Sequence, residues 1–234
     1  PLQEMKVLIS IQLPVTQWQI PAEAVQMLRR RFPHIEFVHA TTPEDRAAGL
    51  RACDIAYTWI LNPSELATAT RLKWLHTSAV AVETLCLDDL FARGIMVSNT
   101  RGVQAVPIAE HVMAMMLALS KRIMLTDHRM RNSAPYNRRD FMGDDVQGRA
   151  IGIVGLGNVG SRVAELCNGL FKMRVMTYDP YVSAEACAAK GVEKMPSLEA
   201  MLAQADYVSI NCPHTKETRG MMGAAQFAAM RDGI

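Results

Sequence analysis

A glycine-rich turn between an apolar run and a helical segment constrains this chain more than any other feature. The run Ile151–Val154 has the continuous apolar character of a buried strand. The residues that follow it directly are Gly155, Leu156, Gly157, Asn158, Val159 and Gly160. In such a turn the first glycine permits a tight bend, the second lets a diphosphate approach the backbone, and the third lets the helix pack on the strand. Because a helix N-terminus also favours an anion, the sequence predicts a dinucleotide site.

An acidic residue ends the next predicted strand, at the distance that a dinucleotide site requires. Asp179 follows Val175–Tyr178, where a carboxylate can accept both hydroxyls of the adenosine ribose. A 2′-phosphate would meet like charge there, with a repulsion of about 4 kcal/mol per charge pair at ~4 Å and an effective dielectric of ~20. No Arg follows, since the next residues are Pro180 and Tyr181. We therefore expect NAD rather than NADP; the alternatives are a solvated acid and a turn that binds nothing.

Composition excludes several classes of function. The chain has 234 residues, of which 50% are hydrophobic and 21% charged, as in ordinary globular proteins. The net charge of +2 gives no argument for a nucleic-acid partner, and no apolar run is long enough to span a membrane. The five cysteines lack CxxC spacing, which argues against a disulfide framework and against a metal site. We expect a reducing compartment, the cytoplasm.

Strand and helix signals alternate through the first 100 residues. The predicted strands are Met5–Ser10, Ile35–His39, Asp54–Thr58, Leu72–His76 and Ile95–Ser98. The predicted helices are Pro21–Arg31, one capped by Thr42, one capped by Asn62, and Val82–Arg93. Such alternation predicts an α/β fold with a parallel sheet that helices cover on both faces.

The second half of the chain carries less regular signals. Pro107–Ile123 is apolar nearly all round, which predicts burial on several sides, either between domains or subunits or within a simple core. Thr126–Gly148 is polar with few periodic signals, which predicts a long surface excursion. Ile234 follows a turn and has the character of a first strand residue. Since a doubly wound domain has two halves and only one is supplied, we expect a truncated chain.

Four stretches together carry a likeness to a known family. They are Leu75–Glu83, Asn99–Gly102 with Pro107–His111, the glycine turn with Asp179, and Ala205–Thr218. The pattern resembles the D-isomer-specific 2-hydroxyacid dehydrogenases, which include phosphoglycerate dehydrogenases and glyoxylate/hydroxypyruvate reductases. The resemblance implies a flavodoxin-like substrate-binding domain at residues 1–100, an incomplete Rossmann NAD-binding domain at residues 101–234, and an active site in the cleft between them.

The resemblance also assigns binding roles. The substrate carboxylate is expected on the backbone amides of one loop: Ser78, Ala79, Val80 and Ala81. The physics agrees, because free amides just before a helix favour an anion; the alternative is an ordinary strand–helix turn. Cys212 and Pro213 are expected at the edge of the cofactor, with Thr218 nearby.

The expected chemistry is hydride transfer between NAD and a small 2-hydroxy or 2-oxo acid, in a homodimer formed through the NAD domain. In the family the base is a His supported by a Glu, and an Arg is the cation for the carboxylate and the carbonyl oxygen. The resemblance sets all three beyond Ile234. We therefore assign no catalytic residue here and expect the chain as written to be almost inactive. His76 ends a predicted strand at the substrate loop and could approach the substrate; the alternative is a role in packing. The other possible functions are a non-enzymatic NAD-binding scaffold of the co-repressor kind and a different Rossmann enzyme.

Overall fold

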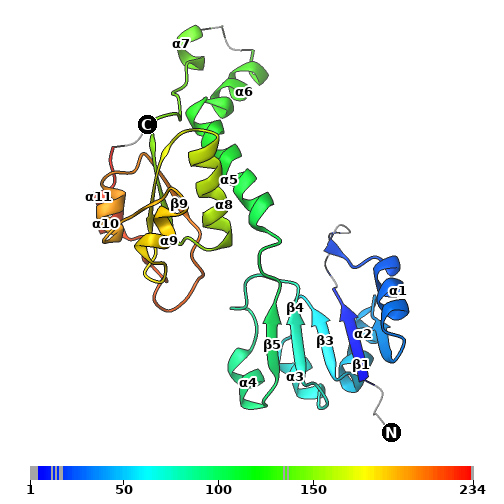
Figure 1. Ribbon diagram of the computed structural model, residues 1–234. Coiled ribbons are helices and arrows are strands. Elements are labelled where there is room, and N and C mark those ends of the chain that lie inside the picture. The colour runs from blue at the N-terminus through cyan, green and yellow to red at the C-terminus, as the bar shows by residue number, and fades with distance from the viewer. Residues whose placement is uncertain are drawn as a thin grey trace. The chain divides into compact units, whose positions relative to one another are not determined.

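The structure is a computed structural model that describes residues 5–11, 13, 15, 18–133, 135 and 137–232. Ile234, interpreted above as the start of a further strand, lies outside these residues. The chain divides into two compact units between Arg101 and Gly102, and each is described by itself (Figure 1).

Unit 1 is a parallel sheet with short helices. The strands are β1 (Met5–Ser10), β2 (Ile35–His39), β3 (Ile55–Thr58), β4 (Trp74–Thr77) and β5 (Met96–Asn99), in the order β2-β1-β3-β4-β5. The helices are α1 (Ala22–Arg31), α2 (Pro43–Ala52), α3 (Pro63–Thr68) and α4 (Leu87–Ala92). All pairs of neighbouring strands are parallel, which confirms the α/β fold predicted from the alternation of signals.

The caps and the core of unit 1 follow from its sequence. The amide of Asp45 donates to Oγ1 of Thr42 over 3.1 Å, and the amide of Glu65 donates to Oδ1 of Asn62 over 2.9 Å. These bonds satisfy amides that a helix N-terminus leaves free, so both predicted caps are confirmed. Leu8, Ala56 and Leu75 lie in register on adjacent strands and are fully buried. Leucines from α2, α3 and α4 pack on this row: Leu50, Leu66 and Leu90.

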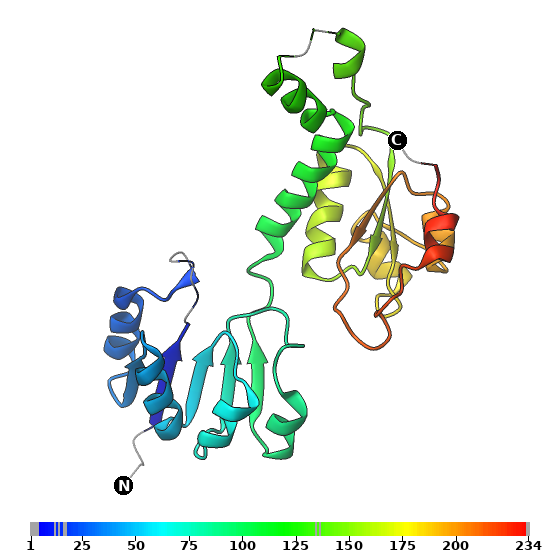
Figure 2. The same ribbon diagram turned by 180° about the vertical axis from the view of Figure 1, so that it is seen from behind.

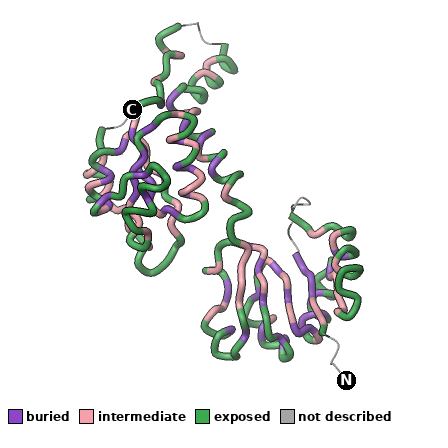
Figure 3. The backbone as a smooth tube through the Cα atoms, viewed as in Figure 1, coloured by how far each residue is buried: buried purple, intermediate pink, exposed green. Residues whose placement is uncertain are grey.

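Unit 2 contains the second sheet. Its strands are β6 (Ala150–Val154), β7 (Arg174–Tyr178), β8 (Glu193–Lys194) and β9 (Tyr207–Ile210), all parallel in the order β8-β7-β6-β9. Its helices are α5 (Ala105–Ser120), α6 (Ile123–Arg131), α7 (Arg138–Phe141), α8 (Asn158–Gly169), α9 (Ala184–Ala188), α10 (Leu198–Leu202) and α11 (Ala224–Ala229). All five residues of β6 are buried, and Figure 3 shows buried residues gathered in the interior of this unit.

The long helix α5 lies beside α8 (Figures 1 and 2), where Met113 and Met116 pack in one core with Val163 and Cys167. One face of this helix, which the sequence predicts to be buried on several sides, is not covered within unit 2. Leu119 is 72% exposed and Met115 is 49% exposed. In unit 2, α8 covers the face of α5 that carries Met113 and Met116, and it leaves Leu119 and Met115 exposed.

The segment predicted as a surface excursion, Thr126–Gly148, contains α7 and most of α6. Neither helix has a buried residue, so hydrophobic periodicity could not reveal them. Local polar contacts support them instead. Arg131 pairs with Asp127 at i,i+4, and Asn137 caps α7 by accepting the amide of Arg139.

Within the described ranges, no helix is both long enough and apolar enough to cross a membrane. The same ranges hold no cluster of three His, Cys, Asp or Glu suited to a metal ion. All five cysteines carry free thiols.

Candidate functional site

The glycine turn joins β6 to α8, and two of its glycines are required by close contacts. Gly155 has a φ of +86°, which side-chain-bearing residues rarely adopt. A Cβ at Gly155 would also lie 2.9 Å from the Cα of Cys212. A Cβ at Gly160 would overlap the carbonyl oxygen of Gly155. The first and third glycines therefore serve the tight bend and the helix–strand packing, as the sequence predicts.

Gly157 has a different role, because a Cβ there would meet nothing within 4 Å. It is exposed, and it is the N-cap of α8, a helix of 12 residues. No side chain in the described part of the chain caps this helix. The first amides of α8, including those of Asn158 and Val159, therefore face open space at a positive dipole end. This opening fits a diphosphate, which needs both a close approach and unpaired donors.

Asp179 is fixed to the same turn by two amides. Its Oδ2 accepts from the amide of Leu156 over 2.8 Å, and its Oδ1 accepts from the amide of Tyr181 over 2.9 Å. An ionised carboxylate offers about four acceptor positions, so two remain for the hydroxyls of a ribose. The structure thus brings Asp179 to the glycine turn.

The residues after β9 lie against the turn through Cys212. A Cβ at Gly155 would collide with the backbone of Cys212. Burial raises the pKa of the Cys212 thiol, which keeps this sulfur uncharged. Thr218 closes the following loop, because its hydroxyl donates to the carbonyl of Pro213 over 2.6 Å and accepts from the amide of Thr215 over 2.8 Å.

The predicted carboxylate loop of unit 1 needs two corrections. Its helix begins at Leu87 rather than at Val82, so the loop does not adjoin a helix N-terminus. The amide of Ser78 donates to the carbonyl of Thr58 over 3.0 Å, and the amide of Ala79 donates to Oγ1 of Thr77 over 3.1 Å. Both amides are therefore used within the protein, and the helix-dipole argument does not apply.

Fewer amides are free to bind an anion than the sequence predicts. Among the described residues, the amides of Val80 and Ala81 have no acceptor, and Ala81 does not have a positive φ. The side-chain amide of Asn99 donates to the carbonyl of Val80 over 2.6 Å and holds the loop in place. The buried Oγ of Ser78 has no hydrogen-bond partner in the described chain. Sequence reasoning named Ser78 only for its amide, whereas the structure singles out its hydroxyl.

His76 lies behind this loop, with both ring nitrogens engaged. Its Nδ1 is 2.8 Å from Oγ of Ser98, and its Nε2 is 3.3 Å from Oγ1 of Thr100. Burial lowers the pKa of His76. These contacts support the packing alternative for this histidine.

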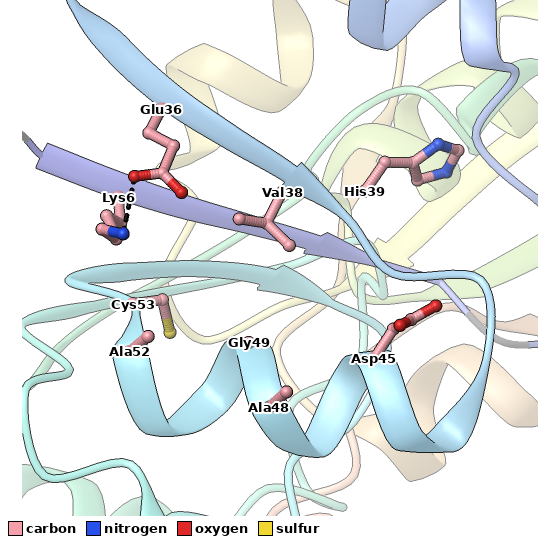
Figure 4. A pocket seen from close by; sticks show the side chains of 9 residues that line it. All are labelled: Lys6, Glu36, Val38, His39, Asp45, Ala48, Gly49, Ala52 and Cys53. Carbon is pink, nitrogen blue, oxygen red and sulfur yellow. Dashed lines mark ion pairs between the residues drawn. The ribbon is translucent and has the colours of Figure 1, made fainter.

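The hollow shown in Figure 4 lies between β2 and α2 and has a volume of about 350 Å³. Lys6 and Glu36 at its rim neutralise each other in an ion pair of 2.7 Å. Burial raises the pKa of the Cys53 thiol to about 11, so the sulfur is unreactive at neutral pH. This hollow offers no chemistry of its own.

Comparisons with known proteins give a family match that covers most of unit 2. Residues 113–234 match the family model of the D-isomer specific 2-hydroxyacid dehydrogenase, NAD binding domain. A D-3-phosphoglycerate dehydrogenase of Archaeoglobus fulgidus is 37% identical over 71% of this chain and 31% of its own length. A glyoxylate reductase of Korarchaeum cryptofilum is 31% identical over 78% of this chain and 56% of its own length.

Solved structures resemble the whole chain. A D-lactate dehydrogenase from Aquifex aeolicus, solved with NAD and lactic acid, matches with a TM-score of 0.77 and 25% identity. The match covers 98% of this chain and 67% of that one. The chain spans only about a third of the phosphoglycerate dehydrogenases to which it is similar. The matched family model spans half of the chain and includes the glycine turn and Asp179, so the chain belongs to the D-isomer specific 2-hydroxyacid dehydrogenase family.

Proposed function

We propose that the protein carrying this chain interconverts a small 2-hydroxy acid and the corresponding 2-oxo acid with NAD. The observation that carries the proposal is the open N-terminus of α8 at Gly157, with Asp179 held beside the same turn. When bound, the nicotinamide accepts or supplies the hydride at C2 of the acid.

Each part of the turn has a binding task in this proposal. The amides of Asn158 and Val159 hold the diphosphate, while Gly157 leaves room for it. Asp179 accepts the hydroxyls of the adenosine ribose. Cys212 and Pro213 border the cofactor, and Thr218 keeps their loop closed.

The substrate carboxylate is assigned to the loop after β4. The amides of Val80 and Ala81 are its donors, because neither has an acceptor among the described residues. Residues 1–100 form the substrate-binding domain and residues 101–234 the NAD-binding domain. We assign the proton transfer to no residue of this chain, because His76, the histidine beside the loop, has both ring nitrogens hydrogen bonded.

Two further properties belong to the proposal. The protein is a homodimer through the NAD domain, supported by the uncovered apolar face of α5 at Met115 and Leu119. It works in the cytoplasm, supported by five free thiols, which suit a reducing compartment.

A pair of glycine variants tests the proposal. Gly157→Val fills the space assigned to the diphosphate, whereas Gly169→Val changes the other end of α8, where a Cβ also meets nothing within 4 Å. We expect Gly157→Val to abolish binding of NADH, measured by the change in its fluorescence, and Gly169→Val to retain it. Equal NADH binding by Gly157→Val and the unchanged protein would remove the basis of the proposed function.

A further inference from the structure

We propose that Trp18 and Trp59 form an aromatic wall that selects acids with a flat, apolar side chain, and that Arg46 is the positioning residue that holds this wall. The inference deepens the proposed function, since it names the class of 2-hydroxy or 2-oxo acid that the substrate-binding domain takes. It rests on three connected observations in unit 1.

The first observation is the stacked pair itself. The centroids of the Trp18 and Trp59 rings are 5.8 Å apart, with an angle of 16° between the ring planes. Trp59 follows β3 directly, and Trp18 lies in the segment between β1 and α1, so both follow the carboxyl ends of neighbouring strands. Ligands of open parallel sheets bind at this edge. Trp18 is 58% exposed, which leaves aromatic surface available to a ligand.

The second observation is that Arg46 forms hydrogen bonds with both residues that flank Trp59. Its Nη1 donates to Oγ1 of Thr58 over 2.5 Å, and its Nη2 donates to the carbonyl of Ile60 over 2.6 Å. Arg46 is only 9% exposed. Burying a guanidinium is costly unless its charge and donors are satisfied. Arg46 therefore fixes the side chain of Thr58 before Trp59 and the backbone carbonyl of Ile60 after it.

The charge of Arg46 is fully used inside the protein. Its Nε donates to Oε1 of Glu65 over 2.6 Å, and its Nη2 lies 3.1 Å from Oε2 of the same carboxylate. Its Nη1 also lies 3.3 Å from the carbonyl oxygen of Ser10. A phosphate or a second carboxylate on the substrate would therefore meet no free cation here, because Glu65 already pairs with Arg46. This neutralised pair disfavours anionic side chains.

The third observation links the wall to the carboxylate loop. The hydroxyl of Thr77 donates to the carbonyl of Trp59 over 2.8 Å and accepts from the amide of Ala79 over 3.1 Å. One hydroxyl thus joins the residue of the wall to the loop assigned to the carboxylate. In the proposal, the carboxylate of one small acid binds the loop and its side chain contacts the wall.

The space beside Trp59 has the chemistry that the inference needs. A hollow of about 170 Å³ is lined by the apolar residues Leu13, Trp59 and Ile60, and by the polar residues Thr58 and Asn62 with the paired Arg46 and Glu65. Aromatic rings prefer offset or edge contacts with other rings, which adds to the burial of apolar area. An aryl or similarly flat side chain therefore fits better than a methyl group or a phosphate ester.

Binding of three 2-oxo acids tests the inference. Dissociation constants for phenylpyruvate, pyruvate and phosphohydroxypyruvate are measured by calorimetry, and NADH binding is measured separately. We expect phenylpyruvate to bind at least about tenfold more tightly than the other two acids. Trp59→Ala and Trp18→Ala should remove this preference, and Trp74→Phe, a change of the third tryptophan at the start of β4, should keep it.

Arg46→Lys tests the positioning role, since it keeps the charge and loses the planar fork. We expect weaker phenylpyruvate binding and a reduced near-UV circular dichroism signal from the stacked pair, with NADH binding unchanged. Should Arg46→Lys fail to fold, the exposed Trp18→Ala still decides the question.

Several outcomes would overturn the inference: equal or weaker binding of phenylpyruvate than of the other acids, no binding of any acid, or a preference that survives both tryptophan variants. The proposed function is tested separately, by the binding of NADH. Selective binding of phenylpyruvate by a protein that binds no NADH would support the wall and contradict the dehydrogenase.

Discussion

The carboxylate of Asp179 accepts a hydrogen bond from the amide of Leu156, with 2.8 Å between Oδ2 and the nitrogen. This bond ties the end of β7 to the middle of the glycine turn. Asp179 is therefore both a structural partner of the turn and the group assigned to the ribose. A variant that removes the carboxylate altogether would change both properties at once.

Asp179→Asn separates the two properties. The amide oxygen of Asn can still accept from Leu156, but the negative charge that repels a 2′-phosphate is gone. We expect the preference for NADH over NADPH to narrow at least about tenfold, a change of about 1.4 kcal/mol. Fluorescence titration with both cofactors measures this ratio, and an unchanged ratio would contradict our assignment of cofactor choice to Asp179.

Stability should distinguish the glycines of the turn. A Cβ at Gly160 would overlap the carbonyl oxygen of Gly155, which is backbone and cannot move away cheaply. We expect Gly160→Ala to lower the free energy of unfolding by about 1–3 kcal/mol. Gly157→Ala has open space around its Cβ and should change the same quantity by less than about 0.5 kcal/mol. Urea denaturation of the two variants compares them, and equal losses would refute the division of roles.

The sequence predicted these glycine roles because they depend on local backbone geometry and on a spacing that few structures share. It did not single out Arg46, although one signal was present. Arg46 stands three and four residues before Gly49 and Leu50, on the face of α2 that packs inward. A charged residue on a buried helix face indicates a buried partner, but the partners lie on other elements: Ser10, Thr58 and Glu65.

The carboxylate loop shows where sequence reasoning reaches its limit. The family motif assigns the substrate carboxylate to the loop after β4, yet two of its four predicted amides donate to Thr58 and Thr77. Hydrogen bonds between segments distant in sequence decide which donors remain free. The late start of α4 at Leu87 has the same origin, since no capping side chain marks that helix within the described residues.

The pair of Arg46 and Glu65 should make unit 1 sensitive to acid. Burial by itself would raise the pKa of the Glu65 carboxyl, but the hydrogen bonds and charge of Arg46, with the amide of Asn62, outweigh it and lower the pKa below its ordinary 4.5. A lowered carboxyl pKa stabilises the fold above the ordinary value, and this contribution is lost as pH falls through the folded pKa.

Glu65→Gln isolates that contribution, because Gln can still accept the amide of Asn62 in the capping box. We expect the free energy of unfolding of this variant to be about 1–3 kcal/mol lower than that of the unchanged protein at neutral pH. The difference from the unchanged protein should shrink as the pH is lowered below 4.5. Denaturation series at several pH values measure it, and a difference independent of pH would contradict the ion pair.

The uncovered face of α5 should determine the oligomeric state. Leu119 is 72% exposed and contributes nothing to the core of unit 2. We expect Leu119→Glu to convert the proposed dimer to a monomer in sedimentation experiments, with unchanged circular dichroism. As a matched control, Leu170→Glu alters a leucine that is 69% exposed on the segment after α8 and should leave the dimer intact. A monomeric unchanged protein would exclude the dimer.

The hydrogen bonds around His76 determine its tautomer. Trp74 donates its indole N–H to Oγ of Ser98, which leaves the Ser98 hydroxyl to donate to Nδ1 of His76. Thr100 donates its hydroxyl to the carbonyl of Thr77, so it can only accept from Nε2 of His76. These roles are met by a neutral ring with its proton on Nε2.

Nitrogen NMR of the His76 ring should therefore report the Nε2–H tautomer at neutral pH. Burial lowers the pKa of this ring below its ordinary 6.5, so the titration should have its midpoint below that value. Because the folded state resists protonation, the associated stability is complete above pH 6.5 and is lost as the pH falls from there through the folded pKa. His76→Gln should remove this pH dependence. A ring that titrates at or above its ordinary pKa, or carries its proton on Nδ1, would contradict the hydrogen-bond chain from Trp74 to Thr77.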